Sequence, residues 1–247
     1  MDPLLRSKNR LLASLSADDF ELIRPHLRVI PLAGERMLFQ AGEEISKAFF
    51  PLSGVISLVL PLQRGEGVEI AMIGRDSMLG AFAALGDPFS LSNVTVLIPG
   101  LASILDVEHL RSAADKSASL RTMLVCHQQA LFVQAQQSAA CNALHSVESR
   151  LARWLLRARD LARSDKLTLT QELMAQMIGA RRNSVSMVAH TLQQFNYIRY
   201  SRGQIEIVDS DALVNASCEC YASVKTQYDR LLGSTCGVSV DQIAAAH

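Results

Sequence analysis

The feature that most constrains this chain is a pair of short amphipathic segments within residues 168–193, separated by a single glycine. Apolar residues recur at helical spacing in both segments: Leu173, Met174, Met177 and Ile178 in the first, and Val185, Val188, Ala189 and Leu192 in the second. Thr170 stands where an N-cap residue is expected, and Glu172 lies in the first turn that follows it. The stretch therefore predicts two consecutive short helices.

The spacing of small residues predicts a tight turn between these helices. Gly179 can adopt the left-handed backbone conformation that ends one helix and redirects the chain. Ala175, four residues earlier, is small enough to let the two helices approach closely, and Val185 would fill the angle between them. We predict a helix-turn-helix whose geometry depends on these three positions.

The second helix begins with four polar residues, which are Arg181, Arg182, Asn183 and Ser184. If the hairpin were only part of a hydrophobic core, these four polar side chains would have no function there. Side chains of these types contact phosphates and base edges, so the hairpin is interpreted as a DNA-binding element.

Two short alternating segments follow the hairpin, at residues 197–200 and 205–208. The turn between them, Ser201-Arg202-Gly203-Gln204, places a glycine where a positive φ is needed. A helix-turn-helix followed by a two-stranded wing that carries an arginine at its tip is typical of a winged DNA-binding domain.

From residue 168 to the end of the wing, the chain resembles the C-terminal domain of Crp/Fnr-family transcription regulators. The resemblance implies that Thr170, Arg181 and Arg202 position the domain on phosphates, and that Arg182, Asn183 and Ser184 face base edges. Arg182 matches the guanine-reading arginine of the family. Asn183 stands where a glutamate is common and Met187 where a second basic residue is common, so we expect a different operator. The expected DNA-binding set is Thr170, Arg181, Arg182, Asn183, Ser184, Ser186, Met187 and Arg202.

Charge and cysteine content fit a DNA-binding protein of the cytoplasm. The net charge is zero over 247 residues, yet residues 150–203 hold ten basic and three acidic residues, a net of +7 that the remainder balances. Five scattered cysteines, an odd number, suit a reducing compartment: Cys126, Cys141, Cys218, Cys220 and Cys236. Neither a membrane span nor a secretory signal is apparent, and no membrane partner is expected.

Residues 1–107 are predicted to form a β-roll preceded by a helical lead-in, capped at Ser16 and ended near Pro25. Glycines separate short apolar runs from Val29 onward, a pattern that predicts a sandwich, barrel or jelly roll. The runs lie at residues 37–39, 48–50, 55–60, 68–73, 94–98 and 102–105. This part resembles the β-roll of cyclic-nucleotide-binding-like sensor domains.

The sequence argues against cyclic AMP as the ligand of this β-roll. Family members that bind the nucleotide carry Gly-Glu and Arg-Ser or Arg-Thr, whereas here Gly80 precedes Ala81. The phosphate position falls near Ser92-Asn93, and the chain has no Lys or Arg between Arg75 and Arg111. We therefore expect a cyclic phosphate to find no cationic partner.

Other ligands of the β-roll are also considered. The cysteines lie too late for an N-terminal iron–sulfur cluster, and His26 and His109 do not form a clustered metal site, so neither a cofactor nor an enzyme is expected. Two interpretations stay open: a sensor for a small apolar or redox effector, or a purely structural scaffold. An apolar pocket would be lined by Met72, Met78, Leu79, Phe82 and Phe89, although these residues are more simply read as core.

Residues 108–145 are predicted to be one long dimerisation helix, with Leu120, Leu124, Leu131, Ala135, Ser138 and Asn142 close to heptad spacing. Cys126 and His127 are interpreted as packing residues, with a redox role left open. A new helix is capped at Ser146, and the junction at His145-Ser146 is the expected hinge. Its four arginines, Arg150, Arg153, Arg157 and Arg159, are assigned to a solvated face, where some would meet the DNA backbone.

Residues 211–232 are predicted to be helical and to cover the DNA-binding domain. Cys218-Glu-Cys220 has no second ligand pair nearby in the sequence, so no metal site is expected there. The tail after Gly233 is expected to be mobile.

The sequence thus predicts an α+β protein in four parts. These are a β-roll sensor domain (residues 1–107), a dimerisation helix (108–145), a winged helix-turn-helix domain (146–233) and a tail (234–247). The resemblance implies a homodimer that binds double-stranded DNA and contacts RNA polymerase, with an unknown small-molecule effector.

Overall fold

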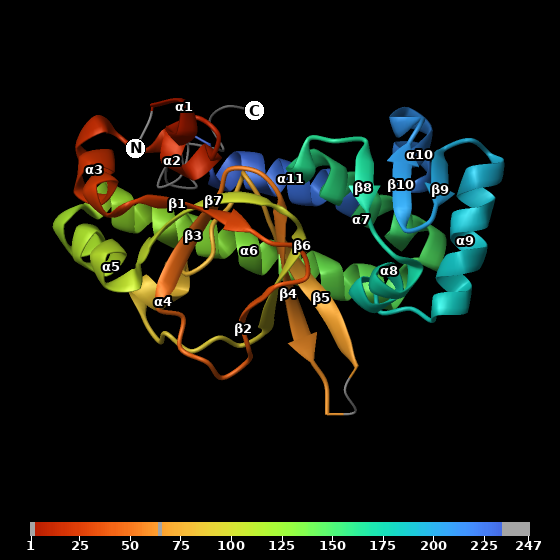
Figure 1. The fold of residues 1–247 in the computed structure, drawn as a ribbon, viewed down its shortest axis with the longest axis horizontal. Helices are drawn as coiled ribbons and strands as arrows, with labels where there is room; N and C mark the ends of the chain where they lie inside the picture. Colours follow the sequence, from red (N-terminus) through yellow and green to blue (C-terminus); the bar gives the residue numbers. More distant parts are fainter. Residues whose placement is uncertain (1–2, 64–65, 234–247) are drawn as a thin grey trace, which may run out of the picture.

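The computed structural model describes residues 3–63 and 66–233 (Figure 1). A long helix, α6 (Ala118–Leu144), runs through the middle of the molecule, with the β-roll (residues 28–106) on one side and the winged domain (residues 147–216) beyond its C-terminal end. The predicted tail at residues 234–247 lies outside the described residues. Within the described residues, none of the helices is both long and apolar enough to cross a membrane.

The β-roll is built from two antiparallel sheets, a three-stranded sheet in the order β1-β7-β3 and a four-stranded sheet in the order β2-β6-β4-β5. Every predicted strand of this region is present. The strands are β1 (Arg28–Leu32), β2 (Met37–Phe39), β3 (Lys47–Pro51), β4 (Val55–Pro61), β5 (Gly67–Ile73), β6 (Asn93–Ile98) and β7 (Gly100–Asp106). Alternate side chains such as those of Phe50, Ile56 and Val94 are fully buried between the sheets, as expected for period-two apolar patterns.

Short helices precede the β-roll: α1 (Pro3–Arg6), α2 (Arg10–Ser14) and α3 (Ala17–Ile23). The Ser16 hydroxyl accepts a hydrogen bond from the Asp19 amide, which confirms the predicted cap. Pro25 lies in a 3-10 turn, Arg24–His26, where α3 ends as predicted.

The predicted single helix over residues 108–145 is in fact two helices, α5 (Val107–Lys116) and α6 (Ala118–Leu144). Ser117 breaks the run, because its backbone is extended and its hydroxyl accepts a hydrogen bond from the Leu120 amide to begin α6. Another short helix, α4 (Ala81–Leu85), follows Gly80 and packs against α6.

The predicted dimer stripe on α6 is wrong in its first half. Leu120 and Leu124 are both fully buried in the hydrophobic core of their own chain. The large apolar residues that α6 exposes along its middle are Val125 and Phe132, with 43% and 63% of their surfaces accessible, and Leu144 is exposed at its end. Helical spacing predicts which residues of α6 share a face. Only the packing of α6 against the β-roll decides which of these faces is buried.

The winged domain contains the predicted helix-turn-helix and one strand that was not predicted. Its elements are α7 (Val147–Ala162), β8 (Lys166–Thr168), α8 (Gln171–Met177), α9 (Arg182–Gln194), β9 (Ile198–Ser201), β10 (Gln204–Ile207) and α10 (Ser210–Ala216). The wing is a three-stranded sheet in the order β8-β10-β9, because β8 pairs with β10 through Leu167 and Ile205. The Ser146 hydroxyl accepts from the Ser149 amide, which confirms the predicted start of α7.

The last helix, α11 (Cys220–Leu231), does not cover the winged domain as predicted. It turns back and lies along α6, which brings the C-terminal end of the described chain beside the N-terminal helices (Figure 1). An ion pair of 2.6 Å between Arg10 and Asp229 joins α2 to α11. Helix α11 therefore contacts α6 and α7, and its ion pair with Arg10 links the C-terminal end of the described chain to the N-terminal helices.

Candidate nucleic-acid interface

The turn between α8 and α9 has the predicted geometry. Gly179 adopts φ +60°, and the Ala180 amide donates to the Ala175 carbonyl at 2.9 Å, the bonding pattern of a glycine-ended helix. Ala175 and Val185 are buried at the angle between the helices. The Thr170 hydroxyl accepts from the Leu173 amide at 3.1 Å, which begins α8. The three structural positions were thus correctly read from the sequence.

Helix α9 buries one face and exposes the other. Val185, Ala189 and Leu192 are buried in the domain core. Arg181, the N-cap residue of α9, and Arg182 are both exposed, and within residues 3–63 and 66–233 neither forms an ion pair. The helix therefore presents two uncompensated cations at its N-terminal end.

The remaining predicted reading residues continue this exposed surface along the first two turns of α9. Asn183 and Met187 are exposed, the latter with 72% of its surface accessible, while Ser184 and Ser186 are half-buried. Because the Met187 side chain is not packed in the core, it can make an apolar contact, such as the contact with a thymine methyl group in the major groove. The first two turns of α9 thus combine polar and apolar groups on one outward face.

The tip of the wing carries an exposed arginine. Both Arg202 and Gly203 have positive φ, +50° and +77°, so the two-residue turn needs the left-handed conformation at both positions rather than at the glycine alone. Arg199 and Lys166, on the neighbouring strands, are paired with Glu206. Arg202 has no such partner among the described residues, which leaves its charge available at the tip.

The predicted solvated face of α7 is wrong for Arg150, Arg153 and Arg157, which are largely buried, whereas Arg159 is half-exposed. Arg150 and Arg153 are each only 9% exposed, and Arg150 donates to the Ile178 carbonyl at 3.1 Å. Arg157 is buried in an ion pair of 2.7 Å with Asp76, and Arg159 pairs with Asp165 at 2.5 Å. Arg150, which also donates to the Asn142 carbonyl of α6, and Arg157 join the winged domain to the rest of the chain, whereas Arg159 pairs within that domain. The buried arginines are therefore not available to the DNA backbone.

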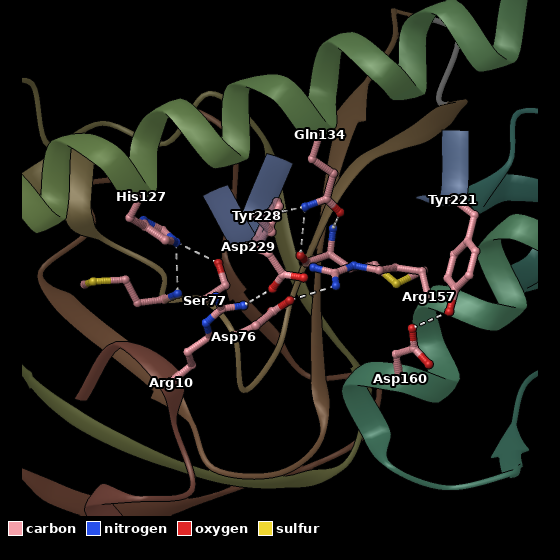
Figure 2. Close-up of polar contacts among 12 residues, drawn as sticks. Arg10, Asp76, Ser77, His127, Gln134, Arg157, Asp160, Tyr221, Tyr228 and Asp229 are labelled. Atoms are coloured by element: carbon pink, nitrogen blue, oxygen red, sulfur yellow. Dashed lines mark hydrogen bonds and ion pairs between the residues drawn. The ribbon is translucent and has the colours of Figure 1, made fainter. Parts of the chain in front are cut away.

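Figure 2 shows the polar joint around Arg157, which gathers residues from the β-roll side, α6, α7 and α11. The Arg157 guanidinium lies over the ring of Tyr228, 4.9 Å from its centroid. The Tyr228 hydroxyl accepts from Gln134 of α6 at 2.7 Å, and Gln134 also bonds both backbone groups of Met72. No sequence signal pointed to this joint, because its members lie far apart in the chain.

A buried carboxyl group forms a second contact between the two halves. Glu69 of β5 accepts from the Trp154 indole at 2.7 Å and from the Ser57 hydroxyl at 2.5 Å. Burial raises the pKa of Glu69 to about 7, although both hydrogen bonds and the nearby Arg153 and Arg157 act in the opposite direction. Glu69 therefore titrates near neutral pH at the surface where α7 meets the β-roll.

The β-roll contains a cavity of about 310 Å³ that opens toward α6. Its lining is mostly apolar, with Ser90, Ser92 and Gln128 as polar members and no charged residue. Met78, Leu79 and Phe82, which were more simply read as core, do line it, and Leu131 and Phe132 contribute from α6. Met72 and Phe89 do not line it, because Met72 packs toward the winged domain and Phe89 is 51% exposed.

His127 ties α6 to the segment that precedes this cavity. Its Nε2 accepts from the Met78 amide at 3.1 Å and lies 2.7 Å from the Ser77 hydroxyl. Complete burial lowers the pKa of His127 to about 3, so the ring is neutral at physiological pH. The interpretation of His127 as a packing residue is confirmed, with the addition that it fixes the backbone at one wall of the cavity.

The structure also gathers a group that the sequence did not predict. Cys218 and Cys220 meet Cys141 and His145 at the end of α6, and their four ligand atoms lie within 4.8 Å of one another. The Cys-Glu-Cys motif has no second pair nearby in the sequence, as stated, but the fold brings one close to it in space. The pair exists at an i, i+4 spacing on α6, 77 residues before Cys218, which only the return of α11 brings into contact.

A helix-turn-helix whose second helix starts with exposed cations that have no ion-pair partner among the described residues, beside a wing with a cationic tip, is the arrangement of a winged helix-turn-helix domain. Residues 149–216 match the family model of the Crp-like helix-turn-helix domain. No curated protein sequence matches the chain significantly.

Solved structures extend the likeness to the whole fold. FixK2 from Bradyrhizobium japonicum matches with a TM-score of 0.66 at 15% identity, covering 78% of this chain and 98% of FixK2. A Crp/Fnr-family regulator from Eubacterium rectale gives 0.65 at 18% identity, covering 85% and 98%. CLP from Xanthomonas campestris, described as a c-di-GMP responsive global regulator, gives 0.64 at 13% identity, covering 78% and 99%. The chain therefore carries a Crp-like helix-turn-helix domain and has the overall fold of these regulators.

Proposed function

We propose that this protein is a transcription regulator of the Crp/Fnr type that binds a palindromic operator as a homodimer, with α9 in the major groove and the wing on the adjacent backbone. The proposal is carried by Arg181 and Arg182 at the start of α9, which are exposed and form no ion pair with any described residue. Arg182, Asn183 and Ser184 would face base edges, with Ser186 and Met187 one turn further along. Thr170, Arg181 and Arg202 would contact phosphates.

The exposed face of α6 supports the homodimer. Val125, Phe132 and Ala139 follow one another at intervals of seven residues and are all exposed, whereas Leu120 and Leu124 of α6 are buried in the core of their own chain. A seven-residue apolar repeat on an uncovered helix face is the pattern of a coiled-coil seam. Two chains joined along this stripe would present two α9 helices to half-sites about 34–36 Å apart.

The cavity of the β-roll favours an apolar effector over cyclic AMP. A cyclic phosphate needs a cationic partner, and the walls of this cavity hold none. Because Leu131 and Phe132 belong to both the cavity wall and α6, a ligand in the cavity would contact the same helix that carries the proposed dimer stripe. We expect cyclic AMP to change neither the melting temperature nor the DNA affinity, while small apolar compounds raise the melting temperature.

The proposal is tested by selecting binding sites from random DNA with the purified protein. An inverted repeat should be recovered, and inserting about half a helical turn between its halves should abolish high-affinity binding. Phe132→Lys should give monomers in sedimentation and lose the operator, because like charges would face each other across the seam. Leu101→Lys changes an equally apolar exposed residue on β7 and serves as the control. Recovery of a single, non-repeated site by a monomeric wild type would contradict the proposal.

A further inference from the structure

The three buried cysteines and one histidine at the end of α6 form a compact group of metal-binding side chains. Cys141 and His145 project from the last turn of α6 and its C-cap, while Cys218 and Cys220 lie where α10 gives way to α11. The three cysteines are not disulfide-bonded. Cys141 and Cys220 are fully buried, Cys218 is 9% exposed, and the His145 side chain is 25% exposed.

The distances fit a single tetrahedral ion. The Cys141 and Cys218 Sγ atoms are 3.5 Å apart, as are Cys220 Sγ and His145 Nδ1, and every pair of ligand atoms lies within 4.8 Å. A tetrahedral zinc ion, with bonds of about 2.3 Å to sulfur and about 2.0 Å to nitrogen, holds its ligand atoms about 3.4–3.8 Å apart. Shifts of less than about 1 Å would therefore complete the coordination sphere.

The surroundings of the group are those of a metal site rather than of a simple cysteine core. Glu219 Oε1 lies 3.3 Å from His145 Nε2, so the carboxylate can hold the far ring nitrogen and direct Nδ1 toward the sulfur atoms. Gln137 donates from Nε2 to Cys220 Sγ at 3.0 Å, a bond that stabilises a thiolate. Arg153, buried in α7, acts electrostatically on Cys141 and would offset the surplus negative charge of three thiolates around a divalent ion.

We propose that Cys141, His145, Cys218 and Cys220 bind one zinc ion, which clasps the end of α6 to the connection between α10 and α11. Sulfur and imidazole ligands in a closed tetrahedron select zinc over magnesium or calcium, which take oxygen ligands. Four protein ligands leave no position for water, so the site is structural rather than catalytic.

The position of the site gives it a consequence for DNA binding. His145 immediately precedes Ser146, where the chain passes from α6 into the winged domain, and Cys218 follows the last helix of that domain. An ion at this point would fix both chain connections of the winged domain to the same helix. Metal binding would thereby set the orientation of α9 relative to α6. This effect rests on the proposed function, whereas the metal binding itself does not.

The first experiment measures metal content in the full-length, reduced protein. After purification with zinc and removal of loosely bound metal, we expect a single zinc ion per chain. Cobalt substitution should give the ligand-field bands of tetrahedral cobalt and a thiolate-to-cobalt charge-transfer band. Cys218→Ser and Cys141→Ser should both lose the ion under the same chelator competition. His145→Cys, which retains a soft ligand, should keep it. Glu219→Gln should weaken zinc binding by about 10–100-fold, the usual effect of losing a carboxylate that orients a histidine ligand.

Ser138→Ala provides the control, because Ser138 is a buried residue of the same helix, three residues before Cys141, that lies outside the group. Its zinc content should equal that of the wild type. A wild-type protein without zinc, or a Cys218→Ser variant with undiminished zinc, would overturn the proposal. Direct oxidation of Cys141 and Cys218 to a disulfide in place of metal uptake would also overturn it.

The second experiment compares DNA binding by the stripped and the refilled protein. Removal of zinc should weaken operator binding by about 5–150-fold, the range of typical coupling between two sites, and zinc but not magnesium should restore it. Zinc bound normally with DNA affinity unchanged would refute the coupling. If neither form bound any DNA, the proposed function would fail while the zinc site stood.

Discussion

Helices α7 and α9 both carry arginines, and the structure uses them in opposite ways. On α7 the guanidinium of Arg157 is buried against Asp76 and Tyr228, and Arg150 and Arg153 are nearly inaccessible. On α9 and at its N-cap, Arg182 and Arg181 are exposed and unpaired among the described residues. The two helices belong to the same domain and contact each other. The arginines of α7 make contacts inside the protein, whereas those at the start of α9 face outward.

The difference teaches that the number of arginines on a helix does not identify a DNA-binding surface. What identifies it is the absence of an internal partner. The body of the protein supplies acceptors to α7, namely Asp76, the Ile178 carbonyl and the ring of Tyr228. Among residues 3–63 and 66–233 it supplies no ion-pair partner to Arg181 or Arg182, so within that part of the chain their charges are left to water or to a polyanion.

The largest expected effect in this comparison belongs to α7. Arg157→Ala should lower the free energy of unfolding by about 3–5 kcal/mol, because it leaves Asp76 buried without its partner. Urea denaturation of the full chain measures the loss. Arg159→Ala is the control, since its ion pair with Asp165 is largely exposed and should be worth at most about 1 kcal/mol. Equal losses in the two variants would mean that burial does not distinguish these arginines.

The buried Glu69 should make the joint between the two halves sensitive to pH. Its pKa is raised from 4.5 to about 7, so folding favours the protonated form. Stability is then fully present below about pH 4.5 and is lost as the pH rises through about 7. Glu69→Gln should remove this loss and be more stable than the wild type at pH 8 by roughly 2–3 kcal/mol.

Denaturation curves of the wild type and Glu69→Gln at pH 5.5 and pH 8 measure the difference directly. Comparison at each pH cancels the titration of other groups, which both proteins share. Glu172→Gln, at an exposed position of α8, should follow the wild type at both values. A Glu69→Gln variant that lost stability with rising pH as steeply as the wild type would show that another group titrates.

On α9 the effect should appear in DNA binding and leave stability unchanged. Arg182→Ala should weaken the operator complex by about 1–3 kcal/mol, the discrimination expected of a bidentate arginine–guanine pair. Binding to random DNA should change little, and the unfolding curve should match the wild type. Titrations with operator DNA and with random DNA measure the specific and the non-specific affinity separately. Equal loss on operator and random DNA would make Arg182 a phosphate contact instead of a base contact.

The smallest effect should come from the wing. Arg202→Ala should weaken operator and random DNA alike and reduce the slope of log affinity against log salt by about 0.9, one phosphate contact. Titrations at several salt concentrations measure this slope. Arg199→Ala is a suitable control, because Arg199 on the adjacent strand is already engaged with Glu206. A change confined to the operator would instead indicate that Arg202 reads sequence.

Local contacts explain why so much of the winged domain could be predicted from the sequence. The turn at Gly179 depends on bonds that span five residues, and the caps at Thr170 and Ser146 reach only three residues ahead. The hairpin at Arg202-Gly203 is equally local. Such elements are encoded by residues that are neighbours in the chain, so their spacing alone predicts them. The β-roll strands followed from the same kind of local alternation.

Features that depend on what covers a helix could not be predicted in this way. Helical period showed that Leu124 and Phe132 lie on stripes of α6, but only the fold decides that Leu124 is covered by the β-roll and Phe132 is not. The sequence also determined that α7 carries arginines on one face, while the packing of β5 and α11 made that face internal. Cys141 and Cys218 are separated by 77 residues, and only the return of α11 along α6 brings their sulfur atoms to 3.5 Å. The periodicity of the sequence predicts which side chains share a face of a helix. The tertiary structure decides whether that face packs against another element or is exposed to solvent, because this depends on segments far away in the chain.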